Sequence, residues 1–165
     1  MGWHYKGEEI DSIDKVPGGA IGFVYKICDE KGKCYIGKKN FFSERKVEVS
    51  ENVYNKLKAS GEEVTRTKNK TLTKSGKGGT VWRYKKVVSG ESDWLTYNSS
   101  NSELKKLAKK EALDKEILQF CYTKQELTYY ETKFQMEFGV IETDNWYNEN
   151  VLGKFYKGVI SKTNK

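Results

Sequence analysis

The sequence predicts an α/β chain of the α+β type, in which a small sheet of three strands is flanked by helices. Two observations predict this class. Short runs of β-branched and aromatic residues occur near residues 25, 35 and 119, and helical patterns with capping residues lie between and after them. The length of 165 residues suits one domain with a single core. We therefore expect residues 1–165 to form one domain.

The first 19 residues are expected to precede the sheet. They are polar and turn-rich, and they end around the chain's only proline, Pro17. The N-terminus lacks the apolar segment of a signal peptide, and the chain has no apolar run long enough to span a membrane. These features predict a soluble, cytoplasmic protein without a membrane partner.

Two strands joined by a tight turn follow this leader. The runs Ala20–Cys28 and Lys33–Ile36 are rich in β-branched and aromatic residues, and Asp29-Glu30-Lys31-Gly32 between them has the composition of a hairpin turn. Tyr25 and Tyr35 would then lie on neighbouring strands.

A first helix is expected next, over Asn40–Val47, because Phe41, Phe42 and Arg45 fall close to one helical face. Glycine-rich breaks interrupt residues 46–93, which favours an insertion over a core segment.

This insertion is expected to contain a helix over Glu51–Ala59 and a hairpin, in which Val81–Val88 alternates like a strand. Eight basic residues and no acidic one occur from Val64 to Lys86, whereas the rest of the chain is nearly neutral despite a net charge of +7. Such a cluster is typical of a polyanion partner, although a solvated basic loop has the same composition. The residues expected to contact nucleic acid are Arg66, Lys68, Lys70, Lys74, Lys77, Trp82, Arg83, Lys85 and Lys86. A plain hairpin with Trp82 packed inward is the alternative.

The second half of the chain contains two further helices around a third strand. Ser100 and Glu103 have capping-box spacing and begin a helix that runs to about Ala112. The third strand is expected over Glu116–Tyr122.

Thr123 and Glu126 form a second capping box, which begins a long helix through Phe138. The tail from Asp144 is aromatic and irregular.

The cysteines and the single histidine argue against a disulfide framework or a zinc site. Cys28, Cys34 and Cys121 are odd in number and lie in predicted strands, so we expect buried, reduced thiols. His4 alone cannot supply a histidine-based zinc site.

Five motif positions occur in an order that resembles the GIY-YIG nuclease family. They are Gly22-Phe23-Val24-Tyr25, Tyr35-Ile36-Gly37, Arg45, Glu131 and Asn148, and they span roughly residues 20–148 once the insertion is set aside. The chain looks most like the small free-standing phage enzymes, which carry segments similar to Ser92-Asp93-Trp94 and Tyr97-Asn98-Ser99-Ser100. The resemblance implies a mostly antiparallel three-stranded sheet, a basic insertion after the first helix, and a DNA endonuclease that uses Mg²⁺ or Mn²⁺.

The resemblance also implies roles for the residues near the hairpin. Tyr25 is the expected general base, and Tyr35 supports or shares that role. A phenol with an ordinary pKa near 10 needs nearby positive charge to act as a base, and Lys38 is placed to supply it. The alternative for Lys38 is an exposed lysine at a strand end.

Three later residues complete the implied site. Arg45 would grip the scissile phosphate through its guanidinium, Glu131 would bind the metal ion, and Asn148 would close the site. Ordinary alternatives are a surface arginine, a solvated helical glutamate and a loop cap.

The chain also departs from the family pattern. Phe23-Val24-Tyr25 lacks the family's glycine, Asn98 stands where related sequences often have glycine, and no histidine lies near the first helix. The alternatives to a nuclease are a non-catalytic nucleic-acid-binding module, against which the intact Tyr25, Tyr35, Arg45 and Glu131 argue, and a basic protein-interaction domain. Cleavage of both strands would call for a homodimer on DNA or for sequential nicks, and a phage-encoded enzyme would act in the host cytoplasm.

Overall fold

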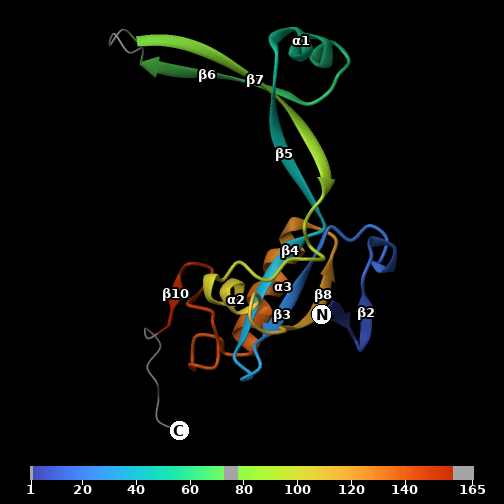
Figure 1. Ribbon diagram of the computed structural model, residues 1–165, viewed down its shortest axis with the longest axis vertical. Coiled ribbons are helices and arrows are strands. Elements are labelled where there is room, and N and C mark those ends of the chain that lie inside the picture. The colour runs from blue at the N-terminus through green and yellow to red at the C-terminus, as the bar shows by residue number, and fades with distance from the viewer. Residues whose placement is uncertain (1, 73–77, 158–165) are drawn as a thin grey trace. The chain divides into compact units, whose positions relative to one another are not determined.

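The computed structural model describes residues 2–72 and 78–157, and these residues divide into two compact units (Figure 1). The first unit comprises Met1–Phe41 and Ser92–Lys165, and the second comprises Phe42–Glu91. The second unit covers most of the range predicted as an insertion, residues 46–93. None of the described helices is long and apolar enough to cross a membrane.

The first unit is built on a five-stranded sheet with the strand order β2-β1-β8-β3-β4. The β3 strand pairs antiparallel with β4 and β8, and β1 pairs parallel with β8 and antiparallel with β2. The strands are β1 Trp3–Tyr5, β2 Glu8–Ile10, β3 Gly22–Cys28, β4 Cys34–Asn40 and β8 Asp114–Cys121. The three predicted strands are therefore confirmed, but the prediction of only three strands is wrong.

The two extra strands come from the polar leader, which was expected to precede the sheet. Trp3 is fully buried, and its indole N–H donates a hydrogen bond to the Trp94 carbonyl oxygen over 2.7 Å. Ile10 is also buried, opposite Trp3 in the β1–β2 register. Tyr5 of β1 also packs against this core, with its ring centroid 4.7 Å from that of Phe120, so three residues attach the segment.

The β3–β4 hairpin is confirmed, and its register places the two motif tyrosines. Tyr25 lies opposite Gly37, and Tyr35 lies opposite Ile27. The Asp29 side chain closes the turn by accepting hydrogen bonds from the N–H groups of Lys31 and Lys33, both over 2.9 Å. These bonds form an Asx-type turn, which accounts for the predicted hairpin turn at this position.

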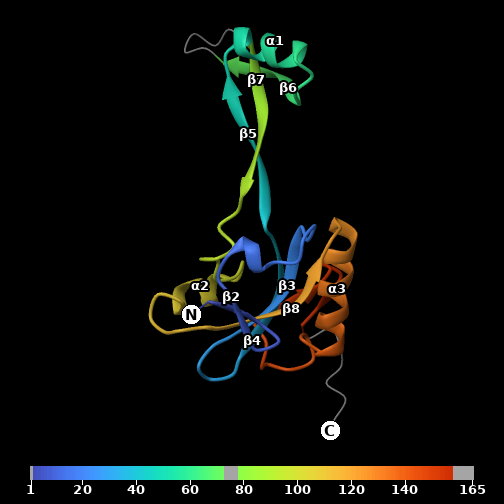
Figure 2. The same cartoon turned by 90° about the vertical axis from the view of Figure 1, so that its right-hand side faces the viewer.

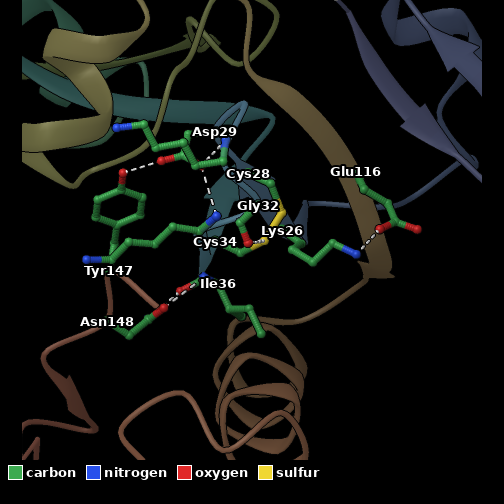
Figure 3. The surroundings of a disulfide bond; sticks show 11 residues. Lys26, Cys28, Asp29, Gly32, Cys34, Ile36, Glu116, Tyr147 and Asn148 are labelled. Atoms are coloured by element: carbon green, nitrogen blue, oxygen red, sulfur yellow. Dashed lines mark hydrogen bonds and ion pairs between the residues drawn. A yellow bond between two sulfur atoms is a disulfide. The ribbon is translucent and has the colours of Figure 1, made fainter. Parts of the chain in front are cut away.

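The end of this hairpin carries a disulfide bond between Cys28 and Cys34 (Figure 3). The prediction of reduced thiols is therefore wrong for these two residues, whereas Cys121 is free and buried as expected. The physical reason is the register, because Cys28 lies directly opposite Cys34 and their Cα atoms are 4.1 Å apart. Neighbouring Cα atoms are close at such a cross-strand pair.

Reduction of this disulfide is expected to lower the free energy of unfolding of the first unit by about 2 kcal/mol, because it removes the closure of a short loop. Thermal unfolding with and without dithiothreitol measures the change. The Cys28→Ser/Cys34→Ser variant is the control, because its unfolding should not respond to the reductant. Three alkylatable thiols in oxidised, denatured protein would contradict the assignment.

Two helices lie on opposite faces of the first unit's sheet (Figure 2). The long helix α3, Lys124–Glu137, covers the face that carries Val24 and Ile36. The short helix α2, Ser102–Leu107, contributes Leu104 to the aromatic cluster on the other face.

The caps of these helices follow the sequence only in part. Thr123 caps α3 as predicted, since its hydroxyl accepts a hydrogen bond from the Glu126 N–H over 3.0 Å. At α2 the cap is Asn101 instead of Ser100, and the helix ends at Leu107, before the predicted end near Ala112. The Asn101 side chain accepts from two backbone N–H groups, which explains the shift of one residue.

Three short elements complete the first unit, and its tail contacts the hairpin turn. The 3₁₀ helix η1 spans Ile13–Lys15, β9 spans Asn150–Val151 and β10 spans Phe155–Tyr156. The Tyr147 hydroxyl donates a hydrogen bond to the Asp29 carboxylate over 2.6 Å, which joins the tail to the hairpin turn (Figure 3).

The second unit is a three-stranded antiparallel sheet with the order β5-β7-β6 and one helix, α1. Its elements are β5 Phe42–Val49, α1 Glu51–Ala59, β6 Val64–Leu72 and β7 Gly78–Glu91. The helix predicted over Glu51–Ala59 is confirmed, and the strand predicted over Val81–Val88 lies within the longer β7.

The helix predicted over Asn40–Val47 is wrong, because β5 occupies most of this range and pairs with β7. Between β4 and β5 the described chain has no helix, so the second unit follows a strand and not a helix. The spacing of Phe41 and Phe42 with Arg45 was misleading. Phe41 is buried in the core of the first unit, whereas Phe42 begins β5 in the second unit.

The chain leaves and re-enters the first unit at adjacent points. The Ser92 N–H donates a hydrogen bond to the Phe41 carbonyl oxygen over 2.8 Å, and the Ser92 hydroxyl donates to the Asn40 carbonyl oxygen over 2.7 Å. Lys39 and Asp93 form an ion pair beside them. Residues 41 and 92 are therefore held together within the first unit.

Candidate active site

The candidate active site lies where α3 packs against β4 in the first unit. Glu131 is on the face of α3 that is turned toward β4, and its carboxylate is 3.0 Å from the Lys38 ammonium. Lys38 also donates a hydrogen bond to the Thr128 hydroxyl, one turn earlier on α3, over 3.0 Å. The Glu131 side chain is only 19% exposed, so this carboxylate is held at the sheet and not in open solvent.

An open pocket of about 240 Å³ adjoins this carboxylate. Three predicted site residues, Tyr35, Glu131 and Asn148, line it together. The complete lining is Tyr35, Glu131, Gln135, Asn148, Glu149, Asn150, Leu152 and Gly153. The structure thus brings together residues that are up to 113 positions apart in the sequence.

The two motif tyrosines lie side by side, with ring centroids 6.3 Å apart. Tyr25 is fully buried, and its hydroxyl is 3.5 Å from that of Tyr97. The Tyr35 hydroxyl is 2.9 Å from the Ser100 hydroxyl, and Tyr35 lines the pocket. Of the two, Tyr35 is the one with access to the pocket beside Glu131.

Both phenols are harder to ionise than an ordinary tyrosine. Burial raises the pKa of Tyr25 well above its usual value, and the neighbouring Tyr97 adds to the rise. Burial also raises the pKa of Tyr35, with the charge of Glu131 adding to the rise and the Ser100 hydrogen bond opposing it. Both side chains are neutral near pH 7, so a tyrosine base depends on additional positive charge in the pocket.

The packing of these two rings requires a glycine at position 37. A Cβ atom on Gly37 would lie 2.6 Å from the Tyr25 hydroxyl oxygen and 2.8 Å from a ring carbon of Tyr35. Such distances are shorter than van der Waals contact. The glycine of the Tyr35-Ile36-Gly37 motif therefore makes room for both tyrosines.

Asn148 binds the backbone of β4 with both ends of its amide. Its side-chain oxygen accepts from the Ile36 N–H over 3.0 Å, and its NH₂ donates to the Ile36 carbonyl oxygen over 2.8 Å (Figure 3). Gln135 donates to the same carbonyl oxygen over 3.2 Å. Asn148 is 3% exposed. Its two hydrogen bonds to Ile36 hold the strand next to Tyr35 in place.

The remaining predicted residues lie in the second unit. Arg45 is exposed on β5, opposite Val88, so its predicted contact with the scissile phosphate stays a prediction. Lys74 and Lys77 lie outside the described residues. The other predicted nucleic-acid contacts lie on β6 and β7, and they are Arg66, Lys68, Lys70, Trp82, Arg83, Lys85 and Lys86.

Sequence reasoning gave no role to several residues that build the site. Tyr97 and Ser100 contact the two motif tyrosines. The sequence had marked their segment for its resemblance to phage sequences and Ser100 as a helix cap, but neither as a site residue. Ser99 between them is buried and has a φ of 94°, a strained backbone angle of the kind that clusters at functional sites. Glu149 also lines the pocket, and nothing in the sequence marked it as a site residue apart from its position next to Asn148.

The donor set of the pocket suits a hard divalent ion. The described residues contain no cluster of three histidine, cysteine, aspartate or glutamate side chains. Glu131 instead offers a carboxylate in a pocket lined mainly by polar side chains. Mg²⁺ keeps several waters and needs only one or two protein carboxylates together with substrate phosphates. Glu131 is therefore a chemically suitable ligand for Mg²⁺ or Mn²⁺.

Comparison with known proteins identifies the family. No curated protein and no solved structure matches the chain. A family model described as "Putative endonuclease segE, GIY-YIG domain" matches residues 3–151. This range contains both motif tyrosines, Glu131 and Asn148, and it includes the leader strands that the motifs alone did not cover. The chain therefore belongs to the GIY-YIG nuclease family and is an endonuclease.

Proposed function

We propose that the protein is a Mg²⁺- or Mn²⁺-dependent endonuclease that hydrolyses phosphodiester bonds in duplex DNA. The single observation that carries this proposal is the convergence of Tyr35 and Glu131 on one polar pocket, with Lys38 bound to Glu131. Family membership supports the nuclease class and DNA as substrate.

Each group in the pocket has a chemical task in this proposal. Glu131 holds the metal ion, which when bound offsets phosphate charge and activates water. Lys38, which forms an ion pair with Glu131, brings a second positive charge next to this carboxylate. Either Tyr25 or Tyr35 would act as the base in its ionised form, after losing its phenolic proton to solvent, and the phenolate would then accept the proton of the attacking water. The added positive charge lowers the cost of ionising that phenol.

The roles of Arg45 and Asn148, the number of strands cut and the cellular location stay predictions. Arg45 is proposed to grip the scissile phosphate and Asn148 to close the site. Cleavage of both strands would take a homodimer on DNA or sequential nicks. Action in the cytoplasm of a host cell, for a phage-encoded enzyme, is also a prediction.

The proposal is tested with supercoiled plasmid incubated with the protein in Mg²⁺, in Mn²⁺ or in excess EDTA. Nicked or linear plasmid is expected with either metal ion and not with EDTA, and added Mg²⁺ should restore cleavage. The product form reports how many strands are cut. Cleavage in EDTA would refute the metal dependence.

The rival function is a non-catalytic nucleic-acid-binding module. It predicts intact plasmid under all conditions together with a gel shift that does not need metal. A basic protein-interaction domain predicts only weak binding that is steeply salt-dependent. The same plasmid samples, run beside a gel shift, separate the three functions.

A further inference from the structure

The register of the second unit's sheet sorts its charged residues onto two unlike faces. Directly paired residues share a face, and successive residues of a strand alternate between faces. One face carries five cations and no strand carboxylate, and we call it the basic face. Its cations are Arg45, Arg66, Lys68, Lys70 and Lys86.

The opposite face is electrically balanced. Its basic residues are Lys46, Arg83 and Lys85, and its acidic residues are Glu44, Glu48 and Glu91. Arg83 forms an ion pair with Glu48 over 2.6 Å, so its charge already has a partner. The excess positive charge of the second unit's strands therefore belongs to the basic face.

Aromatic rings hold two cations on the basic face. The Arg66 guanidinium carbon is 3.6 Å from the centroid of the Trp82 ring and 5.9 Å from that of Tyr84. The Lys68 ammonium is 5.7 Å from the Trp82 centroid. These contacts fix the positions of both charges without neutralising them. Among the described residues, neither cation has an acidic partner within salt-bridge distance.

These cations are carried partly by a two-stranded ribbon. The β5 strand pairs with β7 only from Tyr84 onward, so Gly78–Arg83 pairs with β6 alone, over Thr67–Leu72. Figure 1 shows β6 and β7 continuing together beyond their contact with β5. Lys68, Lys70 and Trp82 lie on this ribbon, and Trp82 is 41% exposed.

The helix α1 covers the part of the basic face around Tyr84, which lies between Trp82 and Lys86 on β7. Tyr54 packs against Tyr84 with ring centroids 4.9 Å apart, and Glu51 accepts a hydrogen bond from the Tyr84 hydroxyl over 2.6 Å. The helix therefore occupies the surface around Tyr84 and leaves Lys68, Lys70 and Trp82 exposed on the ribbon.

We propose that the basic face, centred on Arg66, Lys68 and Trp82, is the surface that docks on duplex DNA, and that Arg83 and Lys85 point away from it. This inference rests on the proposed action on duplex DNA. The charge of this face complements the phosphate backbone, and the major groove of B-DNA admits a two-stranded ribbon. The proposal keeps five of the seven described candidates for nucleic-acid contact on the docking face and excludes Arg83 and Lys85. Arg83 has a structural role instead, because it pairs with Glu48.

Two charge-matched double variants test the inference. Arg66→Gln/Lys68→Gln removes two charges from the basic face, and Lys46→Gln/Lys85→Gln removes two from the opposite face without touching Arg83. Binding is measured by fluorescence anisotropy with a labelled duplex in EDTA, over a series of salt concentrations. Circular dichroism and thermal unfolding report whether both variants remain folded.

The basic-face variant is expected to bind at least about tenfold more weakly, with a salt slope reduced by about two. The opposite-face variant should bind within about threefold of the parent protein. Trp82→Ala should also weaken binding, because the ring that orients Arg66 is lost. Equal losses in the two double variants would overturn the inference, as would unchanged binding by the basic-face variant.

Failure of this inference is distinguishable from failure of the proposed function. If the parent protein nicks plasmid in Mg²⁺ while the two double variants bind equally, only the assignment of the face fails. If the parent protein never nicks plasmid but binds duplex through the basic face, the catalytic proposal fails and the docking surface stands.

Discussion

Replacing Glu131 with glutamine is expected to reduce Mg²⁺-dependent nicking at least about 10²- to 10³-fold, the loss typical of removing one charge-stabilising group from an active site. Glutamine keeps the size of the side chain and its position on α3. It removes the negative charge that would bind the metal ion and that pairs with Lys38. Initial rates on supercoiled plasmid, measured against Mg²⁺ concentration, show whether the loss can be overcome by more metal.

The matched control is Glu137→Gln. Glu137 is on the same helix, its side chain is 53% exposed, and it pairs with Lys133 instead of a sheet residue. This variant should nick at the parental rate. Glu137→Gln should unfold near the parental temperature, because an exposed ion pair contributes little to stability. Thermal unfolding of Glu131→Gln separates a loss of activity from a loss of fold, because the Glu131 side chain is only 19% exposed. Parental activity in Glu131→Gln would remove this residue from the catalytic proposal.

Gly37→Ala is expected to abolish nicking and to destabilise the first unit by about 1–3 kcal/mol, the usual cost of overpacking a core. The added methyl group would overlap the hydroxyl of Tyr25 and the ring of Tyr35. Tyr25 is fully buried among packed neighbours, so its ring cannot move aside freely. The substitution should therefore displace both rings together, whichever of them acts as the base.

Thermal unfolding and plasmid nicking check this expectation, with Gly18→Ala as the control. A methyl group added to Gly18 would meet no atom within 4 Å beyond its chain neighbours, and Gly18 has no positive φ, so alanine should be tolerated there. A Gly37→Ala protein with parental stability and activity would show that the packing of Gly37 against the tyrosines is not required.

The parts of the fold that the sequence predicted are those encoded locally. The β3–β4 hairpin follows from a turn whose aspartate binds its own backbone, and α3 begins at Thr123 because that hydroxyl caps the helix. Glu131 and Tyr35 could be named as candidate site residues because they lie in recognisable motifs on these two elements.

The parts that were missed depend on contacts between distant segments. β1 joins the sheet through its pairing with β8, more than 100 residues later, and β5 forms against β7 despite a local helical spacing. The disulfide follows from a register that only the folded hairpin fixes, although two cysteines flanking a predicted turn were a usable signal. The contacts of Tyr97 and Ser100 with the motif tyrosines are likewise tertiary.

The junction at Phe41 and Ser92 has a consequence for how such a chain can change over evolution. Because a backbone hydrogen bond holds these two residues together, the chain enters and leaves the second unit at adjacent positions. The second unit, Phe42–Glu91, can be exchanged there with only two peptide joins, and the first unit's sheet contains no strand from the exchanged part. Recombination at this junction would replace the proposed DNA-docking surface, and Arg45 with it, while Tyr35, Glu131 and Asn148 would stay in place in the first unit.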